Sequence, residues 1–164
     1  MILLNFTIQI FQTKKMKQNR LYIISLFISV LITFSSCATA QEITLENYLL
    51  NYNYDARKDM KIKSKELVQL LKDDKAQLID IRFEEEYKSW NMPIAISIPL
   101  PDLPNNLDKL NKNKIIVTAC PHKDRAIIAM TYLKTKGYKV KYLTDGLVGL
   151  AEYLRGNNAW NFQN

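Results

Sequence analysis

The sequence has very few residues that could crosslink the chain or bind a metal. Its 164 residues include two cysteines, Cys37 and Cys120, and a single histidine, His122. We expect Cys37 to be removed or lipidated with the N-terminal segment, which leaves one thiol that can form no intramolecular disulfide framework. One thiol and one histidine are also too few for a zinc site of the usual ligand count. We therefore expect no metal and no cofactor, and Cys120 needs an explanation of its own.

The distribution of charge excludes a nucleic-acid-binding protein. The net charge is +7, but residues 1–40 contain four basic residues and no acidic one. Without them the 23 basic residues fall to 19 against 16 acidic residues, a net charge of +3. No basic run with interleaved aromatic residues remains, so the sequence predicts no nucleic-acid partner.

The N-terminal segment has the order of a secretory signal peptide. Basic residues between Lys14 and Arg20 precede an uncharged apolar stretch at 21–34, and small residues follow at 35–40. The apolar stretch is shorter than the ~20 residues that span a bilayer. We therefore predict an exported protein of the periplasm or cell envelope, and we exclude residues 1–40 from the fold. Met16 is an alternative start to Met1.

Two processing routes remain open. Ala38-Thr39-Ala40 fits the small-residue rule for cleavage before Gln41. Cys37, after Phe34-Ser35-Ser36, also resembles a bacterial lipoprotein box, in which case a lipid on Cys37 would attach the protein to a membrane.

The remaining chain alternates short apolar runs with helical patterns. We expect an N-terminal extension at 41–59, one domain at 60–155 and a tail at 156–164. Strands are expected at 77–81, 95–98, 114–119 and 138–143, and helices at 64–71, 83–90, 125–135 and 146–154, with Ser64 as an N-cap and a weak helix within 101–110. Strands that alternate with helices predict an α/β fold, an open parallel sheet with helices on both faces.

Cys120 follows the strongest expected strand and precedes a helix. Ligands bind at such strand ends in open parallel sheets. Loop amides, the helix N-terminus and the basic side chains of Lys123 and Arg125 would favour a thiolate at this position, as a nucleophilic sulfur requires. The alternative is a small buried cysteine that only ends a core strand.

Four segments, in order, resemble the rhodanese-like family between about residues 60 and 154. The segment 78–82 with Glu85, Glu86 and Tyr87 is similar to the family's "D-x-R … E-[FY]" opening. Residues 89–99 are similar to "G-H-I-P-G-A-x-N-I-P", and residues 120–125 to the active-site loop "C-x-x-G-x-R". Asp145-Gly146 lies where the family has a late "G-G" turn.

The resemblance implies a sulfurtransferase with a persulfide on Cys120. Sulfane sulfur would come from a small sulfur-containing anion such as thiosulfate and pass to a thiol or other thiophilic acceptor, and we expect a monomer. Arg125 would orient the loop and the substrate, Asp80 and Arg82 would form a supporting ion pair, and the substrate-binding loop would consist of Pro121, His122, Lys123 and Asp124.

The chain departs from the family pattern at several positions. Lys123 stands where the loop usually has glycine, which would strain the backbone if that position needs a positive φ. Ala126 replaces the common Ser or Thr, and further departures occur at Ser89, Asn91 and Ile94.

Two other functions compete with sulfur transfer. A non-catalytic rhodanese-fold module could bind a partner, or sense oxidants through Cys120. Phosphatases of related architecture use C-x5-R to surround a phosphate, whereas Cys120 and Arg125 are separated by four residues. The tighter loop, with Asp124 inside it, favours a sulfur atom or a small anion.

Overall fold

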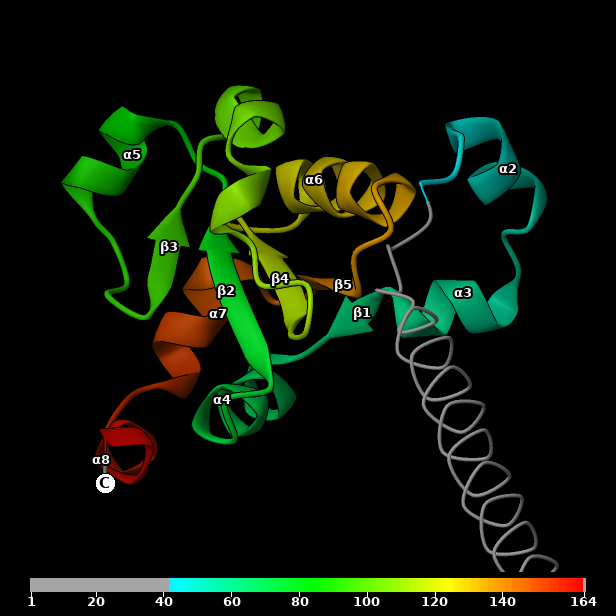
Figure 1. Ribbon diagram of the computed structural model, residues 1–164. Coiled ribbons are helices and arrows are strands. Elements are labelled where there is room, and N and C mark those ends of the chain that lie inside the picture. The colour runs from blue at the N-terminus through cyan, green and yellow to red at the C-terminus, as the bar shows by residue number, and fades with distance from the viewer. Residues whose placement is uncertain (1–41, 164) are drawn as a thin grey trace, which may run out of the picture. The chain divides into compact units, whose positions relative to one another are not determined.

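The computed structural model describes residues 42–163. The expected signal segment lies outside these residues. A parallel sheet of five strands, in the order β1-β5-β4-β2-β3, forms the centre of the domain (Figure 1). The strands are β1 (Lys61–Ile62), β2 (Ala76–Asp80), β3 (Ala95–Ser97), β4 (Ile115–Ala119) and β5 (Val140–Leu143).

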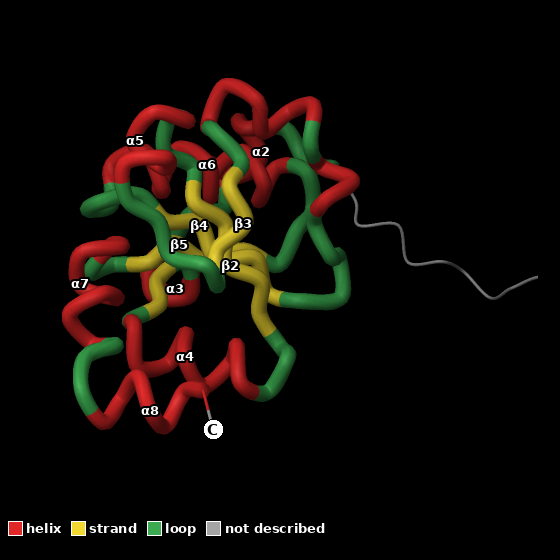
Figure 2. The backbone as a smooth tube through the Cα atoms, turned by 90° about the vertical axis from the view of Figure 1, so that its left-hand side faces the viewer, coloured by secondary structure: helices red, strands yellow, loops and turns green. Residues whose placement is uncertain are grey.

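Helices cover both faces of the sheet (Figure 2). One face packs against α6 and the 3-10 helix η1, and the other against α4 and α7. The open parallel α/β fold predicted from the sequence is therefore confirmed. In chain order the helices are α2 (Leu45–Leu50), α3 (Tyr54–Asp59), α4 (Ser64–Lys72), α5 (Glu84–Ser89), η1 (Leu100–Asn105), η2 (Leu107–Lys109), α6 (Asp124–Thr135), α7 (Gly146–Tyr153) and α8 (Asn157–Gln163).

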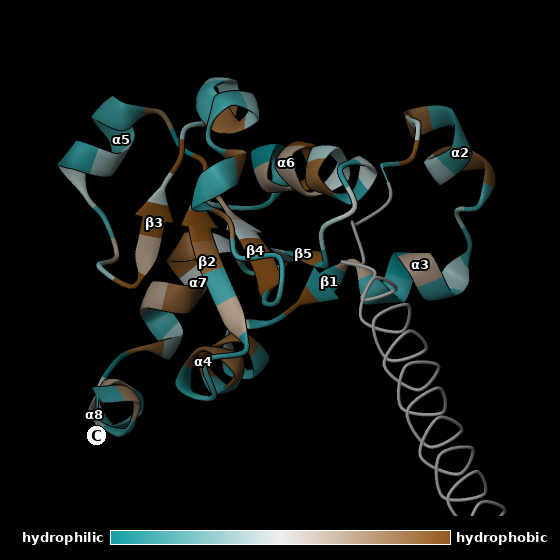
Figure 3. Cartoon of the chain, viewed as in Figure 1, coloured by the Kyte–Doolittle hydropathy of each residue, from teal (hydrophilic) through white to brown (hydrophobic). Residues whose placement is uncertain are grey.

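Strand β4 shows how the sheet divides the core in two. Its side chains alternate between the faces, so Ile116 packs on the α6 side and Val117 on the α4 and α7 side. Both faces of the strand are apolar, as expected of a central strand in a covered parallel sheet (Figure 3). The polar exception is Thr118, whose buried hydroxyl donates to the carbonyl of Ala126 at 2.8 Å. This bond fixes the start of α6 against β4.

Several local expectations need correction. Helix α4 begins at Ser64 itself, with Lys63 as its N-cap, so the predicted cap is wrong by one residue. The Ser64 hydroxyl instead donates to Asp145 Oδ2 at 2.7 Å. Residues 100–109 form two 3-10 helices in place of a weak α-helix. Strand β1 and helix α8 were not predicted.

Residues 42–59 form two short helices on the surface. Neither α2 nor α3 buries a residue fully, and Leu50 and Tyr54 are 83% and 87% exposed. The amide of Ile43 donates to the carbonyl of Thr135 at 2.8 Å, which joins this segment to the end of α6. Within residues 42–163, no helix combines the length and the apolarity that a membrane crossing requires.

Candidate functional site

Cys120 lies directly after β4, at the carboxyl end of the sheet, and α6 begins four residues later. Its relative exposure is 0%, and it belongs to the core cluster on the α6 face. In the part of the chain that the structure describes, Cys120 is the one cysteine, and it is free. The site therefore contains a single buried thiol beneath the loop that runs from Pro121 to Asp124.

The first turn of α7 holds the beginning of this loop. The amide of Leu147 donates to the carbonyl of Cys120 at 2.9 Å, and the amide of Val148 to that of Pro121 at 3.4 Å. The first amides of a helix have no partner within the helix, and here the loop carbonyls accept from two of them. Gly146 is needed at the contact, since its φ is +63° and a Cβ there would lie 2.3 Å from the carbonyl oxygens of Pro121 and His122.

Burial raises the pKa of the Cys120 thiol above its ordinary value, and the nearby Asp124 carboxylate raises it further. The backbone amides of Ala126 and His122 donate to the sulfur and act in the opposite direction. Burial prevails, so the resting sulfur is a protonated thiol at neutral pH. The sequence predicted the reverse, because it gave the loop amides without the cost of removing the sulfur from water.

Asp124 contacts the thiol directly. The Cys120 sulfur donates to Asp124 Oδ1 at 3.6 Å. The Asp124 side chain is exposed, whereas the sulfur is buried. The pKa of Asp124 is lowered, chiefly by a hydrogen bond from the Arg125 amide, so the carboxylate is charged at neutral pH. An incoming reagent therefore meets a negative charge beside the sulfur.

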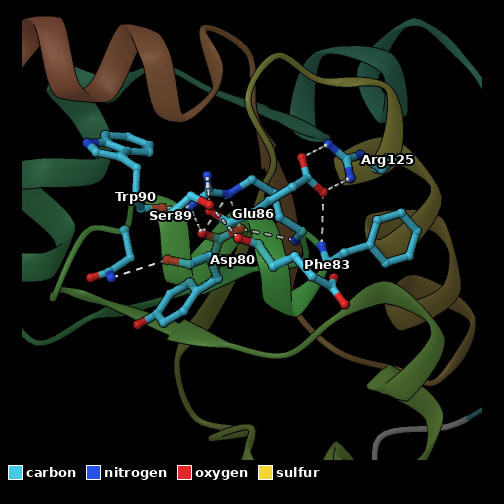
Figure 4. Close-up of polar contacts among 10 residues, drawn as sticks. Asp80, Phe83, Glu86, Ser89, Trp90 and Arg125 are labelled. Carbon is cyan, nitrogen blue, oxygen red and sulfur yellow. Dashed lines mark hydrogen bonds and ion pairs between the residues drawn. The ribbon is translucent and has the colours of Figure 1, made fainter.

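Arg125 forms an ion pair with α5. Its Nη1 lies 2.5 Å from Glu86 Oε2, and its Nη2 lies 2.9 Å from Glu86 Oε1. The Phe83 amide donates to the same carboxylate at 3.1 Å, and the Phe83 ring centroid lies 5.6 Å from Arg125 Cζ. Figure 4 shows the Glu86 carboxylate between the Phe83 amide and the Arg125 guanidinium. The pKa of Glu86 is lowered to about 2, chiefly by the hydrogen bond from Arg125.

Asp80 and Arg82 form the ion pair that the sequence predicted. Both are buried, and Arg82 Nη2 lies 2.6 Å from Asp80 Oδ2. Arg82 also donates to the backbone carbonyl of Trp90 at 2.7 Å, and its guanidinium lies 5.1 Å from the Trp90 ring centroid. These contacts join the end of β2 to the C-terminal end of α5, the helix that carries Glu86.

The structure brings together most of the predicted site residues. Cys120, Asp124 and Arg125 form one cluster, while the side chains of His122 and Lys123 are exposed. Lys123 has a φ of −155°, so lysine in place of the family's glycine requires no left-handed backbone here. Sequence reasoning gave Glu86 no role in the site. The signal was available, because Glu86 is the glutamate of the "E-[FY]" motif.

Comparison with known proteins identifies the family of this fold. Residues 63–153 match the rhodanese-like domain family. The Bacillus subtilis protein named "Putative sulfurtransferase YtwF" is 30% identical over 76 residues, which are 46% of this chain and 74% of that protein. The crystal structure of a rhodanese-like domain protein from Staphylococcus aureus is 30% identical, with a TM-score of 0.51, and the match covers 55% of this chain and 89% of that chain.

A human single-domain sulfurtransferase, TSTD1, has the same fold at 21% identity and a TM-score of 0.51. That match covers 57% of this chain and 96% of the human chain. The shared part is the sheet with its covering helices.

Proposed function

The chain belongs to the rhodanese-like domain family, and on that premise we propose that it is a sulfurtransferase that carries sulfane sulfur as a persulfide on Cys120. The Cys120 sulfur attacks the terminal sulfur of a donor, such as thiosulfate. The S–S bond of the donor breaks, and its electron pair leaves with sulfite. A thiol or another thiophilic acceptor then takes the outer sulfur from the persulfide and restores the Cys120 thiol.

The observation that carries the proposal is the position of the Cys120 sulfur. It lies at the carboxyl end of a parallel strand, and it accepts hydrogen bonds from the His122 and Ala126 amides. Such amides stabilise negative charge on sulfur in the thiolate that attacks and in the persulfide that forms. Asp124 Oδ1, 3.6 Å from the sulfur, is placed to accept the thiol proton as the nucleophile forms.

Arg125 has a positioning role in this proposal. Its guanidinium joins the loop to α5 through Glu86, and Asp80 and Arg82 fix α5 against β2. The ring of loop residues from Pro121 to Asp124 is thereby held between α5 and the first turn of α7. The loop that must surround a transferred sulfur atom is thus braced on two sides.

Turnover by the purified protein tests this function. Thiosulfate with cyanide or a small thiol as acceptor should release sulfite, and Cys120→Ser should abolish the release while the protein stays folded. Sulfite release that persists in Cys120→Ser would show that the chemistry lies elsewhere. Hydrolysis of an aryl phosphate by the unmodified protein, lost in Cys120→Ser, would instead assign a phosphatase.

A non-catalytic module is the second candidate, favoured by the burial and the raised pKa of Cys120. Such a module would bind a partner without transferring sulfur. Oxidant sensing through the thiol, the other form of this alternative, is disfavoured by the same two features, because peroxide oxidises the thiolate. The partner-binding module predicts that Cys120 forms no persulfide with any sulfane donor.

We also propose that the protein acts outside the cytoplasm, in the periplasm or cell envelope, as a monomer. The support for export is the signal-like order of residues 14–40. A lipid on Cys37 would attach it to the membrane, whereas cleavage before Gln41 would release it. The N-terminal residue and mass of the protein purified from cells distinguish these two outcomes.

A further inference from the structure

The charged group in contact with the candidate nucleophile is an acid. Asp124 Oδ1 accepts from the Cys120 sulfur at 3.6 Å, and within residues 42–163 it is the charged side chain bonded to that sulfur. Sulfur donors are commonly anions, and thiosulfate carries two negative charges. A carboxylate at this distance repels each charge of an approaching donor, with an energy that grows with the donor's charge.

The cation of the loop does not offset this repulsion in full. Arg125 lies within electrostatic range of Cys120, but both of its terminal nitrogens bond the Glu86 carboxylate. The Glu86 carboxylate therefore reduces the positive potential that Arg125 contributes around the sulfur. Lys123 has an exposed side chain, and no hydrogen bond joins it to the sulfur among the residues described.

We propose that Asp124 determines donor choice by disfavouring dianionic donors, so that Cys120 accepts sulfur from donors of lower negative charge in preference to thiosulfate. This inference rests on the proposed function and specifies its substrate class. Sulfur donors that end in a thiosulfonate, R–SO₂–S⁻, have one negative charge and represent the favoured class.

The two donor types react by the same step, which makes their charge the variable. With thiosulfate, Asp124 accepts the thiol proton as the Cys120 sulfur bonds the terminal sulfur, the S–S bond breaks, and its electron pair leaves on sulfite, to which the proton then passes. With methanethiosulfonate, the same bond breaks and the pair leaves on methanesulfinate, while the proton passes from Asp124 to the persulfide. Neither step needs an oxidant or a reductant.

The experiment compares kcat/KM for methanethiosulfonate and for thiosulfate across matched variants at low ionic strength. In Asp124→Asn the preference for the monoanion should fall by on the order of tenfold, because one unit charge near the sulfur is removed. Asp124→Ser, a second neutral variant, should behave alike, and Asp124→Glu should keep the wild-type preference. Asp108→Asn removes the same charge from an exposed position on η2 and should change nothing.

Alkylation gives a readout that does not depend on sulfur transfer. Iodoacetate carries one negative charge and iodoacetamide carries none. The rate of alkylation of Cys120 by iodoacetate, divided by the rate with iodoacetamide, should rise severalfold in Asp124→Asn and Asp124→Ser. The rise should be smaller at high salt, which screens the charge of Asp124. Unchanged alkylation and donor ratios in both neutral variants would overturn the inference. If the wild type takes sulfur from neither donor, the proposed function is wrong, and the alkylation ratio alone decides whether Asp124 repels anions at this sulfur.

Discussion

Arg125 and Glu86 are 39 positions apart in the sequence and form a bidentate ion pair, at 2.5 and 2.9 Å. The pair connects the first turn of α6, next to the Cys120 loop, with α5. Planar bidentate pairs of this kind fix orientation as well as distance. The carboxylate also accepts from the Phe83 amide, so one side chain holds both the start of α5 and the end of the loop.

Replacement of Glu86 by Gln should make the stability of the protein depend less on acid pH. The folded-state pKa of Glu86 is about 2, below its ordinary value of 4.5, so the stabilisation is complete above pH 4.5 and is lost as the pH falls towards 2. Water screens this 36% exposed carboxylate, and we expect a loss of about 1 kcal/mol in the free energy of unfolding at pH 7. Urea unfolding of the wild type and Glu86→Gln between pH 7 and pH 3 measures this loss and its dependence on pH.

Glu85→Gln is the control for this prediction, because Glu85 is an exposed neighbour in the same helical turn. Glu85→Gln should change the free energy of unfolding little at any pH. Equal losses in the two variants, or a Glu86→Gln loss that does not shrink below pH 4.5, would contradict the role given to the ion pair.

Arg125→Lys should reduce sulfur transfer severalfold or more while the fold persists. Lysine keeps the charge, but it cannot bond both oxygens of Glu86 in one plane, so the loop is held less firmly. Arg155→Lys alters a surface arginine that pairs with Glu152 and lies away from Cys120 in sequence. That control should keep wild-type kcat/KM. Full activity in Arg125→Lys would mean that the loop does not need the bidentate pair.

Gly146→Ala should destabilise the protein by about 3 kcal/mol, through left-handed backbone strain and the collision of its Cβ with the carbonyl oxygens of Pro121 and His122. Gly156 also has a positive φ, but a Cβ there meets open space, so Gly156→Ala should cost only about 1 kcal/mol. Thermal unfolding compares the two. In Gly146→Ala the rate of sulfur transfer should fall as well, since the displaced carbonyls belong to the loop. Equal costs would show that the close approach does not constrain the loop.

Cys120 should titrate above the pH at which a free thiol ionises. Burial and Asp124 raise its pKa, so the rate of alkylation by iodoacetamide should reach its midpoint at a higher pH than that of a free thiol, such as the cysteine of a short unstructured peptide. Asp124→Asn should lower the midpoint, because the repelling charge is gone. A wild-type midpoint below that of the free thiol would show that the His122 and Ala126 amides outweigh burial.

The sequence predicts the sheet well because its strands are apolar and strongly patterned. The apolar run that ends at Ala119 predicted strand β4. Cys120 was predicted to be the nucleophile because it directly follows that strand. The ion pair of Asp80 with Arg82 was also predictable, since the two are neighbours in a motif. Strand β1 could not be predicted, because its two residues, Lys61 and Ile62, are too few to show an alternation of apolar and polar side chains.

Contacts between distant segments account for the rest of what the sequence left open. The pairing of Glu86 with Arg125, and of Ser64 with Asp145, depends on how elements pack. Local propensity gives Ser64 as a cap, yet the packing of α4 against α7 directs its hydroxyl elsewhere. The pKa of Cys120 was misjudged for the same reason, because burial is a property of the whole fold.

The central claim is that Cys120 carries sulfane sulfur, and intact-mass analysis tests it most directly. The wild type and Cys120→Ser are each incubated with methanethiosulfonate or thiosulfate. The donor is then removed, and the mass of each protein is measured in the absence of reductant. We predict a mass increase of one sulfur atom in the wild type that is absent from Cys120→Ser and that cyanide removes. A wild-type mass that stays unchanged with both donors, or an equal increase in Cys120→Ser, would contradict the persulfide account.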